Sequence, residues 1–502
     1  MVLLGRSDQS IDRITFLDAR GLGVDGGWEC LAALMDSTSP ETIHFADVRH
    51  PLYFYVTDGC MTIATSLKTL SIRRHESGLP VEVDQELRSA YRDAGLVLPP
   101  LTILRDIFQV PLYSTFHRRS TGYVLEFTGI ARGAAPFQDD DAVFRDLRRE
   151  LTEAVKGHDE ARVVCTLSGG ADSATLLSVV CSVVAPARIR TLTCRMPGFD
   201  GEVDRARRIS DRCGVENLVY EPEGVDAAAV ADEYVARFGN LVYDPVVPVL
   251  TSMLRTFDGD IPSGRPVLIV EGQGADTVLA GLPHNAALAL YSRRAARMFR
   301  ILKGLLPQPS EWLQQHWRFV YRVIKTVRLL AEPTWERALL RALDFEPERY
   351  PRYYATLVSM LQWLEGQSRD RHKAIMVFFL LILQSREMQK YHLLPDGFRV
   401  VLPFMARSFV ERCFATPTRM FMRAGRRKLP IVRRARALFP EIFSSVKTTP
   451  FAVRYNVASV QPQAPSHRPS GSYAQLKEHC LEALANTLSQ TAPEAAVPGI
   501  VS

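Results

Sequence analysis

The sequence lacks several features that mark specialised classes of protein. Its 502 residues contain no CxxC pair and no cluster of metal-ligating side chains, and the eight cysteines are scattered, several of them within apolar runs. We therefore expect reduced, buried thiols and a cytoplasmic protein, not a disulfide framework or a zinc site. The first ten residues also lack the apolar region of a signal peptide.

Long apolar runs and internal repeats are missing as well. The longest apolar run, residues 374–383, is about half of a membrane span, so we expect a buried helix and no membrane span. With 47% hydrophobic and 23% charged residues, the composition is that of an ordinary globular protein. The net charge of +6 suits a phosphate-bearing ligand or an acidic peptide without identifying either. We interpret the basic run at 293–300 as a solvated helix face.

The pattern of predicted elements divides the chain into three parts. Residues 1–135 alternate short apolar runs with turns, as in an antiparallel β-rich domain with a few helices. Residues 136–456 begin with a helix that the acidic residues 139–141 can cap, and strands then alternate with helices. This predicts a doubly wound, mostly parallel α/β sheet, followed beyond residue 285 by an almost entirely helical extension. The tail, 457–502, is rich in Pro, Ser and Ala, and we expect partial disorder there.

The segment TLSGGADS, residues 166–173, follows a predicted strand and opens a helix. Glycines at such a place let backbone amides converge on an anion at the positive end of the helix. Ser168 and Ser173 add hydroxyl donors. The Asp172 carboxylate would repel a phosphate unless a cation lay between them, which implies Mg²⁺. SGGxDS is the signature of the pyrophosphatase loop, where a substrate attacks the α phosphorus of ATP; a capped glycine turn is the plain alternative.

A second loop repeats this arrangement in PVLIVEGQGADTVLAG, residues 266–281. Its strand is followed by two glycines, and Asp276 opens the next helix. Loops at the carboxyl ends of strands in one such sheet share a crevice, so we predict that Asp276 and Asp172 hold Mg²⁺ together. The residues predicted to bind ATP are Leu167, Ser168, Gly169, Gly170, Asp172, Ser173, Cys194, Gly272, Gln273 and Gly274.

A third element, residues 432–451, combines a basic amphipathic helix, an FPEIF turn and a loop that carries Lys447. A lysine folded over the crevice can neutralise negative charge that develops on the carbonyl and the α phosphate. We therefore predict that Lys447 is catalytic, the alternative being a solvated loop side chain. No catalytic base is identifiable from the pattern, and Glu202, Asp204, Glu271 and Glu441 are the candidates.

These three elements, in this order, resemble the asparagine synthetase superfamily. Residues 51–70, 106–116 and 400–417 are also similar to segments of that family, so the resemblance covers most of residues 1–455. It implies a degenerate glutaminase-like domain of the Ntn, αββα type ahead of the synthetase domain. It also implies an AMP-forming carbon–nitrogen ligase that uses ATP and Mg²⁺.

The chain departs from the family at several functional positions. Val2 stands where a glutaminase has its nucleophilic cysteine, so ammonia should not come from glutamine. Gln273, Thr277 and Ala406 replace acidic residues of asparagine synthetases. Arg399 stands where β-lactam synthetases have a glutamate that pairs with a tyrosine. The lasso peptide cyclases also lack the cysteine, and their second loop is similarly GxGxD with a proline nearby.

The resemblance therefore implies a lasso peptide macrolactam synthetase. Such an enzyme adenylates an Asp or Glu side chain of a leader-cleaved precursor peptide, and the N-terminal amine of the peptide closes the ring. A leader peptidase and a leader-binding protein are the implied partners. A β-lactam synthetase-like or other small-molecule ligase is the alternative within the family. The β-rich domain and the second loop disfavour a tRNA-modifying enzyme, so we expect no nucleic-acid partner, and the retained carboxylates and lysine disfavour a non-catalytic binding protein.

Overall fold

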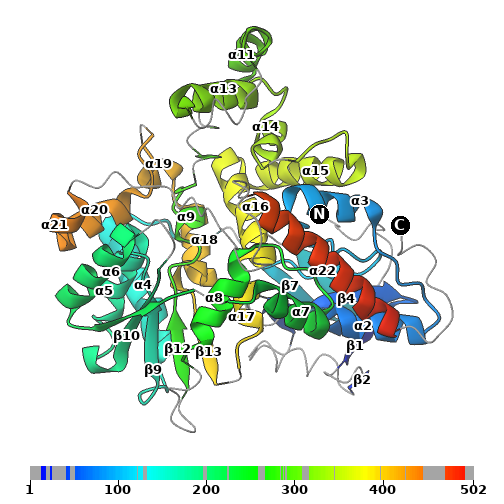
Figure 1. Ribbon diagram of the computed structural model, residues 1–502, viewed down its shortest axis with the longest axis horizontal. Coiled ribbons are helices and arrows are strands. Elements are labelled where there is room, and N and C mark those ends of the chain that lie inside the picture. The colour runs from blue at the N-terminus through cyan, green and yellow to red at the C-terminus, as the bar shows by residue number, and fades with distance from the viewer. Residues whose placement is uncertain are drawn as a thin grey trace.

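The computed structural model describes residues 13–17, 23–24, 41–45, 51–120, 122–127, 130, 133–195, 200–222, 225–257, 266–282, 284–285, 288, 291–307, 316–343, 345–395, 397–423, 425–444 and 470–491. Figure 1 shows the sheet of residues 162–401 on one side of the molecule and the N-terminal strands on the other. One hydrophobic core runs through both parts.

The central sheet has five parallel strands in the order β11-β10-β9-β12-β13. They are β9 (Arg162–Thr166), β10 (Ile189–Cys194), β11 (Glu216–Tyr220), β12 (Val267–Val270) and β13 (Phe398–Val401). The helices between them are α5 (Ala171–Val180), α6 (Asp200–Cys213), α7 (Ala227–Phe238) and α8 (Val246–Arg255). The chain leaves β9 toward β10 on one side and later enters β12 on the other, so the carboxyl ends of β9 and β12 flank a topological switch point. The predicted parallel α/β sheet is confirmed.

The described residues of the extension beyond 285 are almost entirely helical, as predicted, and they include one strand, β13, that the sequence did not indicate. The four residues FRVV are too few to show a strand period, and their pairing with β12 comes from the fold. Helix α9 (Ala275–Val278) follows β12 directly. The described helices beyond residue 285 are α11 (Arg293–Leu305), α13 (Arg318–Leu330), α14 (Trp335–Ala342), α15 (Pro351–Ser368), α16 (Arg371–Arg386), α17 (Gln389–His392), α18 (Arg407–Ala415), α19 (Thr418–Phe421), α20 (Leu429–Leu438) and α21 (Pro440–Phe443).

The apolar run at 374–383 forms the middle of α16 and is buried throughout, as predicted. In the part of the chain that the structure describes, no helix combines the length and apolar character needed to cross a membrane.

The N-terminal part contains two sheets. One has the order β2-β1-β5-β4-β6 and the other β3-β7-β8, and every pair except β1–β5 is antiparallel. The strands are β1 (Arg13–Leu17), β2 (Gly23–Val24), β3 (Thr42–Phe45), β4 (Tyr53–Thr57), β5 (Cys60–Ala64), β6 (Phe108–Gln109), β7 (Ser114–Arg119) and β8 (Gly122–Phe127), with helices α2 (Leu67–Glu76) and α3 (Gln85–Ala94). The β-rich character is as predicted, whereas the glutaminase-like assignment and the domain boundaries remain predictions.

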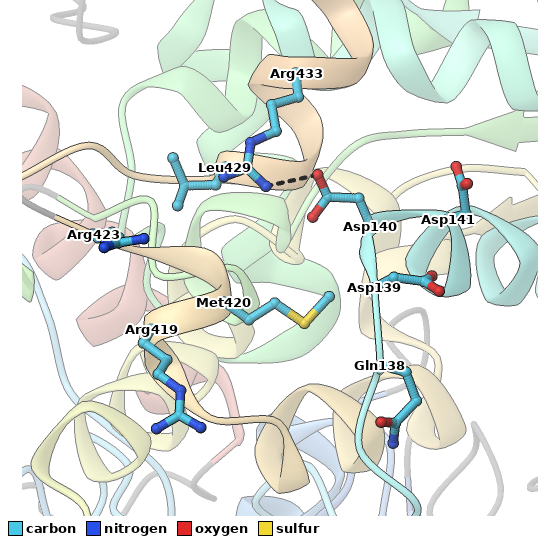
Figure 2. A pocket seen from close by; sticks show the side chains of 9 residues that line it. All are labelled: Gln138, Asp139, Asp140, Asp141, Arg419, Met420, Arg423, Leu429 and Arg433. Atoms are coloured by element: carbon cyan, nitrogen blue, oxygen red, sulfur yellow. Dashed lines mark hydrogen bonds and ion pairs between the residues drawn. The ribbon is translucent and has the colours of Figure 1, made fainter.

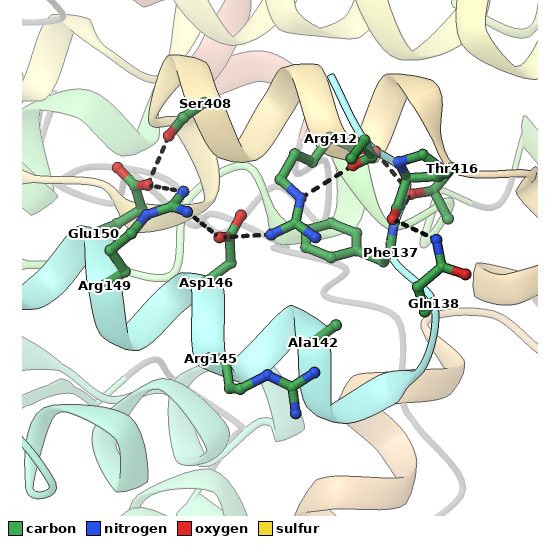
Figure 3. Close-up of polar contacts among 12 residues, drawn as sticks. Phe137, Gln138, Ala142, Arg145, Asp146, Arg149, Glu150, Ser408, Arg412 and Thr416 are labelled. Atoms are coloured by element: carbon green, nitrogen blue, oxygen red, sulfur yellow. Dashed lines mark hydrogen bonds and ion pairs between the residues drawn. The ribbon is translucent and has the colours of Figure 1, made fainter. Parts of the chain in front are cut away.

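Helix α4 (Asp140–Val155) begins at the predicted place, because the Asp139 side chain accepts a hydrogen bond from the first turn. Figure 3 shows how α4 is fixed to α18. The buried carboxylate of Asp146 accepts a hydrogen bond of 2.8 Å from Arg412, whose guanidinium lies 4.3 Å from the centre of the Phe137 ring. This contact holds α4, which precedes β9, against α18, which follows β13.

The tail contains helix α22 (Ser470–Thr491), which the sequence analysis did not predict. Leu476, Cys480, Leu484 and Leu488 recur every fourth residue and are buried. The Pro, Ser and Ala content that suggested disorder conceals this apolar face. Helix α22 packs on α7, α2 and α3, and thereby joins the N-terminal part to the α/β part.

Candidate active site

The loop after β9 has the conformation that an anion-binding turn requires. Gly169 has φ of +70°, and a Cβ atom there would lie 2.5 Å from the carbonyl oxygen of Glu202. The Ser173 hydroxyl accepts a hydrogen bond from the Ser168 amide at 3.3 Å and lies 3.2 Å from the Gly170 carbonyl oxygen. No side chain in the described part of the chain caps α5 at Gly170, which leaves first-turn amides for a ligand.

The loop after β12 lies against the first loop. A Cβ atom added at Gly272 would be 3.9 Å from atoms of Asp172. Gly274 has φ of +91°, and a Cβ atom there would lie 2.6 Å from the Met405 side chain. Asp276 follows in the first turn of α9. The two predicted loops therefore meet at the switch point, as the sequence pattern predicts.

Lys428 joins the two loops. Its ammonium lies 2.6 Å from Asp172 Oδ2 and 2.8 Å from Asp276 Oδ1. Burial lowers the pKa of Lys428, but the two carboxylates raise it by more, so the net direction is upward. Burial also raises the pKa of Asp172, against the effect of the Lys428 ammonium, and the 2.6 Å contact is that of a carboxylate with an ammonium.

The sequence reasoning missed Lys428 and chose Lys447 instead. Lys447 lies outside the described residues, so its role remains a prediction. Lys428 belongs to the basic segment 423–436 and directly precedes the Leu-Pro start of α20, with φ of +50°. The only sequence feature that could have identified Lys428 is its position just before a predicted helix. Several arginines surround it, so this feature does not distinguish it from its neighbours.

Two of the four predicted bases lie on the surface. Asp204 is 73% exposed beside Arg207, and Glu441 is 44% exposed beside Arg212. Glu202 lies next to the first loop, 3.7 Å from Arg205, and burial raises its pKa. The two surface carboxylates, Asp204 and Glu441, therefore do not lie in the crevice.

The fourth, Glu271, belongs to a buried polar cluster beneath the second loop. Its carboxylate accepts hydrogen bonds from Lys390 at 2.7 Å and from the hydroxyl of Tyr391. The neighbouring Gln273 amide donates to Glu387, and burial raises the pKa of Glu387 to about 7, although the Lys390 ammonium lowers it. Glu387, Lys390 and Tyr391 come from the end of α16 and from α17, and no local motif marks them in the sequence.

The remaining predicted residues take supporting positions. Leu167 pairs with β10 through its backbone at 2.8 Å, and Cys194 ends β10, where burial raises its thiol pKa to about 12. Of the divergent positions, Thr277 is buried, Arg399 is an exposed residue of β13, and Ala406 begins α18. Val2 lies outside the described residues.

A cavity of about 530 Å³ opens beside α20 (Figure 2). It lies between the start of α4 and helices α19 and α20, and its lining residues are Gln138, Asp139, Asp140, Asp141, Arg419, Met420, Arg423, Leu429 and Arg433. Arg433 pairs with Asp140 at 2.9 Å. The lining residue Leu429 follows Lys428 directly in the chain, so this cavity and the carboxylate pair share the start of α20.

Three solved structures illustrate the low level of similarity to this chain. NH3-dependent NAD synthetase from Campylobacter jejuni has 17% identity, with 44% of this chain and 95% of that chain covered, at a TM-score of 0.21. The U34-tRNA thiolase NcsA from Methanococcus maripaludis has 14% identity, covering 49% and 79%, at 0.23. Glutamine-dependent NAD+ synthetase from Acinetobacter baumannii, solved with ADP, has 14%, covering 62% and 69%, at 0.22. TM-scores this low do not establish a common fold with these proteins.

The family of the chain is established by its match to a family model. The asparagine synthase model matches residues 146–463, which is more than half of the chain and includes both loops and α20. No curated protein was found to match the chain. The chain belongs to the asparagine synthase family and is an ATP-using carbon–nitrogen ligase.

Proposed function

We propose that this ligase is a lasso peptide cyclase. It adenylates the side-chain carboxylate of an Asp or Glu in a precursor peptide, and the N-terminal amine of the same peptide then displaces AMP to form a macrolactam. The observation that carries the adenylation step is the meeting of Asp172 and Asp276, from two strand-end loops, at the ammonium of Lys428. The precursor peptide, a leader peptidase and a leader-binding protein are the partners that follow from this proposal.

The described residues have separate tasks in this reaction. Ser168, Ser173 and the free amides at the start of α5 hold the β and γ phosphates while the substrate carboxylate attacks the α phosphorus. That attack forms the acyl–adenylate bond and releases pyrophosphate. The amine then attacks the acyl carbon, loses a proton and expels AMP. The Lys428 ammonium lies where it can offset negative charge on the phosphates.

The two carboxylates also suit Mg²⁺. Asp172 Oδ1 is buried and has no hydrogen-bond partner among the described residues, so it is available to coordinate a cation. Among the described residues no three acidic, His or Cys side chains gather to form a metal site, so phosphate oxygens and water would complete the coordination. Bound there by Asp172 and Asp276, Mg²⁺ would neutralise phosphate charge.

The cavity beside α20 favours a peptide over a polyanion. Unlike Arg433, Arg419 and Arg423 have no acidic partner among the described residues, so they can donate hydrogen bonds to a carboxylate. Residues 139–141 on the opposite wall are acidic and repel a nucleic acid. A substrate with both carboxylate and amine groups, such as a peptide, matches both walls.

The test is ATP-dependent turnover with peptides encoded beside the gene, followed by mass spectrometry. Formation of AMP and pyrophosphate together with loss of one water from the peptide supports the proposal. Lys428→Met should slow AMP formation by roughly 100-fold, the effect of removing one group that stabilises developing charge. Arg436→Met, at an exposed arginine of the same helix, is the matched control and should keep its rate.

Other outcomes separate the alternatives. Turnover of a small amino acid without any peptide would contradict the cyclase proposal and favour a β-lactam synthetase-like ligase. Equal rates for Lys428→Met and the control would remove Lys428 from the reaction, whichever substrate is used.

A further inference from the structure

Exposed apolar side chains gather at one end of the molecule. Helices α11 and α13 pack on each other and project at the top of Figure 1, where α14 links them to the body. The exposed large apolar residues of the described chain all belong to this pair of helices and their edges: Met298, Ile301, Leu302, Leu305, Trp317 and Val323. Exposed apolar residues on soluble proteins are normally scattered singly, whereas a contiguous group of them marks an interaction surface.

Four of these residues form an apolar stripe along α11. Met298, Ile301, Leu302 and Leu305 are spaced by three and four residues and therefore lie on one face of the helix. They are 38–78% exposed, whereas Ala296, on a different face, is buried. The sequence interpretation of residues 293–300 as a solvated face missed this stripe, because most of it follows residue 300.

The same two helices are strongly basic. There are five arginines and lysines in α11 and four in α13, and neither helix contains Asp or Glu. The whole chain has a net charge of only +6, so the rest of the sequence is net acidic. The apolar stripe therefore lies on a part of the molecule that is also strongly basic.

We propose that α11 and α13 dock the protein on the surface of an anionic membrane. The apolar stripe and Trp317 would enter the headgroup layer, and the flanking arginines would contact lipid phosphates. A helix with an apolar face, basic flanks and an aromatic residue has the composition of one that lies in a lipid interface. The absence of acidic residues from both helices favours an anionic surface as the partner. This inference does not depend on the reaction proposed above.

Vesicle flotation of the full chain tests the proposal. We expect binding to vesicles of phosphatidylcholine and phosphatidylglycerol in equal parts and little binding to phosphatidylcholine alone. The bound fraction should fall at least fivefold at 0.5 M NaCl compared with 0.05 M. Ile301→Ser/Leu305→Ser and Arg297→Gln/Arg300→Gln should each reduce it by a similar factor, because apolar and electrostatic attraction act together.

A charge-matched control separates docking from general attraction. Lys156→Gln/Arg436→Gln removes two positive charges outside α11 and α13 and should bind like wild type. Equal loss in this control, full binding by the α11 variants, or no binding by wild type would each overturn the proposal. All these side chains lie on the surface, so unchanged circular dichroism should accompany every result.

Discussion

At the scale of single residues, charge in the crevice is arranged in two layers. Above, Lys428 sits between Asp172 and Asp276, at the edge that a nucleotide would reach. Below the second loop, the Lys390 ammonium donates to Glu271 at 2.7 Å, and Gln273 contacts both Lys390 and Glu387. Burial penalises the charged form of the Glu387 carboxyl, and its effect on the pKa exceeds the opposing effects of Lys390 and Arg386.

The lower layer makes stability depend on pH through Glu387. Its pKa rises on folding from 4.5 to about 7, chiefly by burial. The folded state therefore keeps a proton that the unfolded state loses, so this contribution is complete below pH 4.5 and is lost as pH rises through 7. Over that window it amounts to about 3 kcal/mol. In Glu387→Gln, whose side chain stays neutral, the unfolding free energy relative to wild type should rise by up to that amount between pH 4.5 and 8.

Urea unfolding at several pH values measures this difference. Glu441→Gln, at an exposed carboxylate on α21, is the control and should show no such trend. A difference between Glu387→Gln and wild type that stays constant with pH would show that Glu387 is not the group retaining the proton.

At the scale of elements, the first loop depends on one glycine. Gly169 and Gly157 have φ of +70° and +74°, so alanine carries similar backbone strain at both, about 1–2 kcal/mol. They differ in surroundings, because a Cβ at Gly169 meets the backbone of α6 at 2.5 Å and one at Gly157 meets nothing within 4 Å. Gly169→Ala should therefore lower ATP affinity at least tenfold, while Gly157→Ala changes stability only. Calorimetric titration with ATP measures this, and equal affinities would contradict a tight loop–α6 contact.

Local patterns predicted the elements whose signal lies within one segment. The strand–loop–helix at TLSGGADS, the second glycine loop and the cap of α4 by Asp139 all appear as expected. Features that need distant partners were missed. Lys428 acquires its role only when α20 reaches both loops, and Glu387 and Tyr391 meet the second loop from over a hundred residues away. The strand β13 exists because β12 lies beside it.

At the scale of the whole molecule, the last described helix joins parts that are distant in the chain. Helix α22 packs on α7, α2 and α3, and Tyr473 donates a hydrogen bond to the Tyr243 carbonyl oxygen at 2.8 Å. Ion pairs tie it to both sides, through Glu478 with Arg92 and His479 with Asp232, each at 2.8 Å. These pairs are exposed and contribute little, so the buried leucine face supplies most of the attachment.

This face predicts a shared loss of stability in both parts. Leu484 is 1% exposed, so Leu484→Ala should lower the unfolding free energy by about 2–5 kcal/mol, the usual cost of such a cavity. Because α22 contacts both parts, hydrogen exchange should accelerate in α2 and in α7 together. Glu482→Ala, on the same helix at a more exposed position, is the control and should leave exchange unchanged. Acceleration in only one of the two helices would mean that α22 stabilises that part alone.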